Sequence, residues 1–143
     1  MFRKMLIALS LLGLVALIMA ACANVTAAGG DEVSLGEEFT LPVGQSVTVS
    51  GENLVIKFEE VTADSRCPKG AHCIWAGEAK ADIKVTFNGQ TSVITLIESG
   101  GTSGFTGAAF GGYKISFQIL PYPELGNPLS AGDYKLLMNV VRA

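Results

Sequence analysis

The chain has 143 residues, 49% of them hydrophobic, with 10 basic and 13 acidic side chains and a formal net charge of −3. This length suits one domain with a single hydrophobic core. The acidic balance and the lack of a Lys/Arg cluster in the sequence exclude a nucleic-acid-binding protein and a polybasic membrane patch, because both need concentrated positive charge.

The N-terminal segment is typical of an export signal. Arg3 and Lys4 precede an apolar run that continues to Ala23, which is the order of the charged and hydrophobic regions of a signal peptide. The run contains Met19-Ala20-Ala21-Cys22, which resembles the lipobox of bacterial lipoproteins. This resemblance implies a signal peptide over 1–21, a lipid on Cys22, and an exported, membrane-anchored chain that faces the periplasm or the extracellular side.

Two other interpretations of this segment stay open. Cleavage after Ala23 would use Ala21-Cys22-Ala23 as an ordinary small-residue site and release a soluble protein. An uncleaved run would be just long enough to span a bilayer. In the lipoprotein interpretation, loss of Arg3 and Lys4 from the 10 basic residues leaves 8 against 13 acidic ones, a net charge of −5, so attachment depends on lipid.

The folded domain is predicted to span 35–143. Residues 22–34 carry no apolar period and are rich in small and polar residues, which predicts a flexible tether. After the tether, apolar side chains alternate with period two and no helical period is sustained, so the domain is expected to be all-β. Glu38 to Leu41 and Ser46 to Ser50 are the first two predicted strands, and Pro42 is expected at an edge or a turn.

A β-hairpin gives the strongest pattern in the chain. Ala79 to Phe87 alternates strictly, Asn88-Gly89 favours a type I′ turn, and Gln90 to Glu98 is the returning strand. This register pairs residues that share a core face: Phe87 with Gln90, Ile83 with Ile94, and Ala81 with Leu96.

Three further alternating segments begin at Leu54, Tyr113 and Tyr134. About seven short strands separated by turn signals predict an antiparallel β-sandwich, of which the immunoglobulin-like arrangement is one version, with a β-barrel as the alternative.

Two connections are longer than a hairpin needs. Ser99 to Gly112 is rich in glycine and is predicted to be a mobile loop. Its Phe105 and Phe110 form a candidate binding surface for a protein partner, or else pack into the core. Pro121 to Gly132 holds several prolines and is expected to be stiffer.

Cys67 and Cys73 are the thiols that remain once Cys22 carries the lipid. In an oxidising compartment their pairing is the default expectation, and Pro68-Lys69-Gly70 between them can turn tightly. A loop this short gains about 2 kcal/mol in the chain-entropy model. We therefore expect a structural disulfide that fixes a local turn.

The string Asp64-Ser65-Arg66-Cys67-Pro68, followed by Cys73-Ile74-Trp75-Ala76-Gly77, resembles a recurrent family of small bacterial secreted proteins and lipoproteins. The resemblance implies a β-rich envelope domain with a disulfide, and it assigns no catalytic residue. Physical roles follow from the residue types. Asp64 and Ser65 can bond turn amides, Arg66 can form a fork with Asp64, Glu60 or Glu78, and Trp75 can cover the disulfide as an aromatic lid.

Neither an enzyme nor a cofactor is expected. His72 is the only histidine in the sequence, so a catalytic triad would have to use it beside a disulfide. Glu59 and Glu60 are neighbours on a strand and therefore face opposite sides. No phosphate-binding glycine motif occurs, and the cysteine spacing is not that of a thioredoxin-like site.

A non-catalytic binding or structural role in the cell envelope is therefore the expected function. One alternative is a copper or zinc site formed by Cys67, His72 and Cys73, which requires both thiols to be reduced. A further alternative is a protease-inhibitor-like loop that presents Arg66 or Lys69 to a protease cleft.

Overall fold

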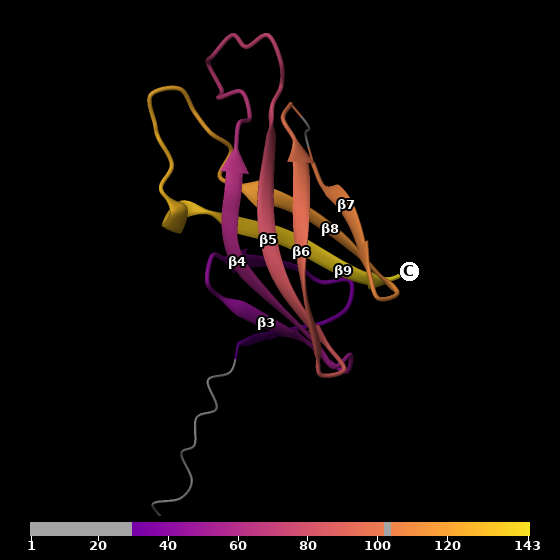
Figure 1. The fold of residues 1–143 in the computed structure, drawn as a ribbon. Helices are drawn as coiled ribbons and strands as arrows, with labels where there is room; N and C mark the ends of the chain where they lie inside the picture. The colour runs from indigo at the N-terminus through magenta and orange to yellow at the C-terminus, as the bar shows by residue number, and fades with distance from the viewer. Residues whose placement is uncertain (1–29, 102–103) are drawn as a thin grey trace, which may run out of the picture.

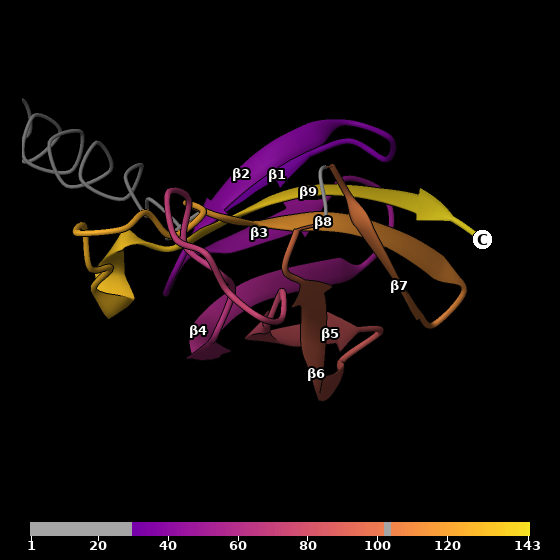
Figure 2. The same cartoon turned by 90° about the horizontal axis from the view of Figure 1, so that it is seen from above.

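The computed structural model describes residues 30–101 and 104–143 as a β-sandwich (Figures 1 and 2). The predicted signal peptide and Cys22 lie outside these residues. One sheet has five strands in the order β1 (Asp31–Val33), β3 (Ser46–Val49), β4 (Leu54–Asp64), β5 (Glu78–Phe87) and β6 (Gln90–Ser99). The other has four, in the order β2 (Glu38–Pro42), β9 (Lys135–Arg142), β8 (Tyr113–Leu120) and β7 (Thr106–Phe110). Neither sheet closes into a barrel, so the sandwich prediction is confirmed.

All neighbouring strands are antiparallel except β1, which pairs in parallel with β3. The predicted β5–β6 hairpin is confirmed in register, with Phe87 opposite Gln90 and Ala81 opposite Leu96. Asn88 and Gly89 both have positive φ, at 49° and 78°, as a type I′ turn requires.

The core lies between the two sheets and is built by the alternating residues. The side chains of Ile56, Phe58 and Ile83 from the first sheet and of Ile119 and Leu136 from the second are fully buried. Because successive strand residues face opposite sides, the period-two pattern of the sequence places every second side chain in this layer.

The tether prediction is wrong at its C-terminal end. Asp31–Val33 lies within the segment predicted to be flexible, yet it forms β1 along β3, and Val33 is buried. A strand of three residues with a single buried side chain has no period for a sequence pattern to reveal.

The long glycine-rich loop prediction is also wrong in part. Thr106–Phe110 forms β7, which pairs with β8 at the edge of the second sheet. Small residues occupy most of this strand and hide its alternation.

Strand β4 positions the functional site described below. Two register shifts, between Phe58 and Glu60 and between Val61 and Ala63, let β4 continue past the core as far as Asp64. In the part of the chain that the structure describes, the one helical segment is a 3₁₀ turn (Ala131–Asp133). Within residues 30–101 and 104–143, no helix has the length and hydrophobicity needed to cross a membrane.

Candidate functional site

The connection from β4 to β5, residues 65–77, is here named the cysteine loop, and it stands at one end of the sandwich (Figure 1). The predicted disulfide is confirmed: Cys67 and Cys73 are bonded, with their Cα atoms 5.9 Å apart. Backbone bonds close the base of the loop, where Ser65 N donates to Glu78 O at 2.8 Å and Cys67 N to Ala76 O at 2.9 Å. The loop is therefore an ordered extension of the β4–β5 hairpin.

Gly77 makes the narrow base of the loop possible. Its φ is +73°, and a Cβ at this position would lie 1.8 Å from the carbonyl oxygen of Ser65. Glycine is the residue that tolerates both conditions. The glycine that ends the Cys-x-Trp-Ala-Gly string thus has a structural reason.

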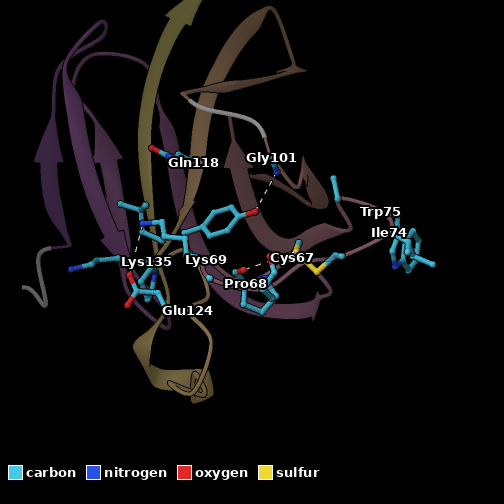
Figure 3. Close-up of a pocket in the computed structure, with 16 residues that line it drawn as sticks. Cys67, Pro68, Lys69, Ile74, Trp75, Gly101, Gln118, Glu124 and Lys135 are labelled. Carbon is cyan, nitrogen blue, oxygen red and sulfur yellow. Dashed lines mark hydrogen bonds and ion pairs between the residues drawn. A yellow bond between two sulfur atoms is a disulfide. The ribbon is translucent and has the colours of Figure 1, made fainter.

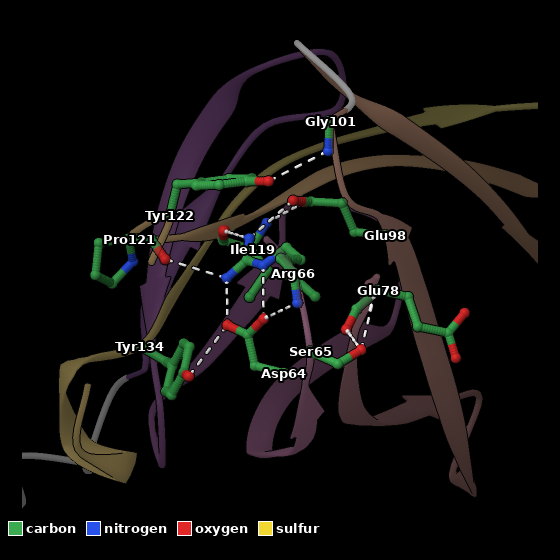
Figure 4. A network of polar contacts seen from close by, with 10 residues as sticks. All are labelled: Asp64, Ser65, Arg66, Glu78, Glu98, Gly101, Ile119, Pro121, Tyr122 and Tyr134. Carbon is green, nitrogen blue, oxygen red and sulfur yellow. Dashed lines mark hydrogen bonds and ion pairs between the residues drawn. The ribbon is translucent and has the colours of Figure 1, made fainter. Parts of the chain in front are cut away.

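Arg66 belongs to the start of this loop and is buried, with 2% of its surface exposed (Figure 4). Its guanidinium forms a fork with Asp64, through Nε to Oδ1 at 2.9 Å and Nη2 to Oδ2 at 2.6 Å. It also donates to the carbonyl oxygens of Ile119 at 2.7 Å and Pro121 at 3.1 Å. The predicted Arg66–Asp64 fork is confirmed, whereas Glu60 and Glu78 are not its partners.

Glu98 is a second carboxylate of this network, and the sequence interpretation missed it. Arg66 Nη1 donates to Glu98 Oε1 at 2.9 Å, and the backbone N–H of Ile119 donates to Glu98 Oε2 at 2.6 Å. The signal was present in the hairpin register, which places position 98 on the same inward face as Leu96. An inward carboxylate needs a buried cation, and Arg66 is that cation.

The remaining contacts of Asp64 fix the start of the loop. Its Oδ1 also accepts from the backbone N–H of Arg66 at 3.2 Å, as the turn-amide prediction required, and its Oδ2 accepts from the hydroxyl of Tyr134 at 3.2 Å. The predicted role of Ser65 is confirmed too, because its hydroxyl bonds the backbone of Glu78 at 3.1 Å.

Burial and Arg66 act in opposite directions on the pKa of Asp64. Burial alone would raise the pKa of this carboxyl, but the hydrogen bonds and positive charge of Arg66 outweigh it and hold the pKa below its usual range. Burial and the Asp64 carboxylate both raise the pKa of Tyr134. The network therefore keeps Asp64 ionised and Tyr134 protonated at neutral pH.

Tyr122 connects the network to the neighbouring 121–125 segment. Arg66 Cζ lies 4.9 Å from the centre of its ring and Lys69 Nζ lies 5.9 Å from it, both within cation–π range. The backbone of Lys69 also pairs with this segment, donating to Pro123 O at 2.9 Å and accepting from Leu125 N at 3.0 Å. The cysteine loop is thus attached to a second loop as well as to its own base.

A groove of about 990 Å³ lies along the junction of these two loops (Figure 3). Its lining includes the disulfide, Tyr122, Lys69, Glu124 and Trp75. Figure 3 shows Ile74 and Trp75 on the far side of the disulfide from Lys69 and Glu124.

Trp75 does not form the predicted lid. Its surface is 72% exposed and that of Ile74 is fully exposed at 104%, so neither side chain is covered by the domain. Cys73 is exposed as well. The prediction failed because it assigned the aromatic ring to the nearest apolar surface, whereas in the structure Ile74 and Trp75 lie at the exposed part of the loop.

The geometry of this loop does not support the two alternatives from sequence, the copper or zinc site and the protease-inhibitor-like loop. Cys67 and Cys73 are joined to each other, so neither provides a thiolate, and among the residues that the structure describes no cluster of three or more His, Cys, Asp or Glu side chains could hold a metal. Arg66 is buried and cannot enter a protease cleft. Lys69 is exposed, but its backbone is already paired with the 121–125 segment.

Phe105 and Phe110 do not form one surface. Phe105 is 43% exposed just before β7, while Phe110 is half-buried and packs against the core. His72 is exposed on the cysteine loop. None of His72, Phe105 and Phe110 is among the residues that line the groove.

Comparisons with protein-family models, with curated proteins and with solved structures find no match to this chain. The family resemblance of the cysteine string stays a prediction, and the functional argument depends on the geometry of the site.

Proposed function

We propose that this chain is a non-catalytic cell-envelope domain, held at a membrane by a lipid on Cys22, that binds a protein partner through Ile74 and Trp75. The observation that carries the proposal is the exposure of these two adjacent side chains on an otherwise well-anchored loop. Large exposed apolar side chains on a rigid frame are typical of binding surfaces, and tryptophan is among the residues that contribute most to them.

Rigidity of the loop supports this assignment. The disulfide, the bonds at the base and the attachment to the 121–125 segment hold the backbone of the loop that carries Ile74 and Trp75 before any partner arrives. A surface that is already ordered loses little conformational entropy on binding. The groove beside the loop, with Tyr122 in its lining, would receive a side chain of the partner next to Trp75.

Site-specific photo-crosslinking in intact cells tests the binding surface. A photoreactive amino acid at position 74 of the full chain is expected to give one discrete protein adduct, and Trp75→Ala in the same chain should remove most of it. The matched control places the same group at Val141, which is 37% exposed on β9, away from the loop. An identical adduct pattern at positions 74 and 141, or no adduct at position 74, contradicts the proposal.

The lipid anchor has its own test. Mass spectrometry of the mature protein is expected to find Cys22 as the first residue with the added mass of a lipid. An unmodified N-terminus at Asn24 or a retained Met1 would show that the anchor is absent.

A further inference from the structure

Strand β6 forms one edge of the five-stranded sheet and is ten residues long. Its odd-numbered residues face away from the core. Among them Val93 is 61% exposed and Ile97 is 48% exposed, and both lie on the outer face of the sheet.

The backbone of these same residues faces the open edge. The two-residue turn makes Phe87 and Gln90 a hydrogen-bonded pair, and hydrogen-bonded pairs then recur at every second residue along the hairpin. The bond from Gly100 N to Gly77 O at 2.7 Å, at the other end, fits this alternation. The even-numbered residues of β6 therefore bond β5. Thr91, Val93, Thr95 and Ile97 point their N–H and C=O groups outward, and no backbone hydrogen bond found within residues 30–101 and 104–143 uses those groups.

This edge lacks the protection that sheet edges in monomeric proteins normally have. From position 90 to position 97 the strand holds no charged residue, no proline and no register shift. The other edges are different: β1 has three residues, β7 has five, and β2 has five and ends in Pro42. A long, regular and uncharged edge is suited to pairing with another strand.

We infer that β6 pairs with β6 of a second copy of this chain, antiparallel and centred on Thr95. This register places outward-facing backbone groups opposite one another on both strands, as a ladder requires. It also sets Val93 against Ile97 of the other copy on both sides of the centre, so the exposed apolar side chains cover each other. Shifting the centre by one or two residues would leave at least one of them opposite a threonine or a glycine.

Charge and symmetry agree with this partner. The nearest charged side chains on the outer face belong to Lys80, Asp82 and Lys84 of β5, one strand further from the junction, so no like charges meet across it. Asp82 already accepts a bond from the Thr95 hydroxyl at 2.6 Å. Because each copy uses its one long open edge, the pairing is isologous and closes at two copies.

Cysteine cross-linking of the full chain in the envelope of the cells that make it tests this register. In Thr95→Cys the two introduced Cα atoms would lie about 5.5 Å apart across the two-fold axis, within disulfide range. In Val93→Cys the equivalent atoms would be about 14 Å apart, because each faces position 97 of the other copy and is therefore offset by four residues along the strand. Mild oxidation should therefore yield at least about tenfold more covalent dimer from Thr95→Cys than from Val93→Cys.

A second measurement separates pairing from chance collision. Val93→Lys and Ile97→Lys, added together to the Thr95→Cys chain, are expected to abolish the dimer, whereas Val141→Lys should leave it unchanged. Circular dichroism confirms that each variant is folded. Equal cross-linking at positions 93 and 95, no dimer at position 95, or a dimer that survives both lysines would overturn the inference.

Discussion

Each end of the sandwich has a cluster of an arginine, a carboxylate and a tyrosine, and the two clusters differ in their surroundings. At the cysteine-loop end, Arg66 forms a fork with Asp64, which also binds Tyr134. At the other end, where the β5–β6 turn lies, Arg142 contacts both oxygens of Glu52 at 2.8 and 3.0 Å, and the Tyr113 hydroxyl donates to Glu52 at 2.6 Å.

Bond lengths do not distinguish the two clusters, and the carboxylates are equally buried, with 9% of the Asp64 side chain and 8% of the Glu52 side chain exposed, but the arginines differ. The side chain of Arg66 has no exposed surface, whereas that of Arg142 is 70% exposed. Arg66 also bonds Glu98 and two backbone carbonyls, which have no counterpart around Arg142 among the contacts of the described residues. Solvent and salt screen the exposed Arg142, so the network around the buried Arg66 is expected to contribute more to the stability of its end of the molecule.

Substitution of the two arginines gives the largest expected difference. Arg66→Met leaves Asp64 and Glu98 buried without their cation and should lower the free energy of unfolding by about 3–5 kcal/mol. Arg142→Met should have a much smaller effect, because water replaces the lost contacts. Urea unfolding of both variants measures the contrast, and equal losses would show that burial does not separate the two clusters.

Sequence reasoning predicted the framework better than this network. The hairpin from β5 to β6 was predictable residue by residue, because alternation and an Asn-Gly turn are local signals. Arg66 and Asp64 were predictable partners because they are two positions apart in one turn. Glu98 and the carbonyl of Ile119 lie 32 and 53 positions from Arg66, and only the packing of the two sheets brings them together.

Exposed apolar residues were the other weakness of the sequence interpretation. A tryptophan near a disulfide suggests a covered ring, but the direction of a side chain at a loop tip depends on the backbone below it. The backbone of this loop depends on features of the folded state that composition does not give, such as the positive φ of Gly77 and its close contact with Ser65.

Removal of the disulfide should have a smaller effect than removal of Arg66. Cys67→Ala with Cys73→Ala is expected to lower the free energy of unfolding by about 2 kcal/mol, the entropy of closing a short loop. The backbone bonds at the base and the Arg66 network remain in this variant and should keep the loop in place. Thermal unfolding under oxidising conditions measures the loss, and an unchanged melting temperature would deny the disulfide a stabilising role.

The smallest expected difference between the two ends is in how each contributes to the loss of stability at low pH. Burial opposes ionisation of Asp64, but Arg66 lowers its pKa in the folded state, so as the pH falls below about 4 the unfolded chain takes up this proton first and stability is lost. The pKa of Glu52 is lowered too, by its hydrogen bonds to Tyr113 and Arg142, so it contributes a loss of the same sign over a similar range of pH.

Salt separates these two contributions. High salt should weaken the part of the Glu52 loss that comes from the exposed Arg142, whereas the part that comes from the Tyr113 hydroxyl and the loss due to the buried Arg66–Asp64 fork should change little. Unfolding is therefore compared for Asp64→Asn and Glu52→Gln at low and high salt between about pH 2 and pH 5, the range in which carboxyl groups titrate. We expect Asp64→Asn to flatten the pH dependence equally at both salt concentrations and Glu52→Gln to flatten it less at high salt than at low salt. If the two variants respond to salt in the same way, the buried and exposed clusters are electrostatically equivalent, and the contrast between the ends of the sandwich is one of packing.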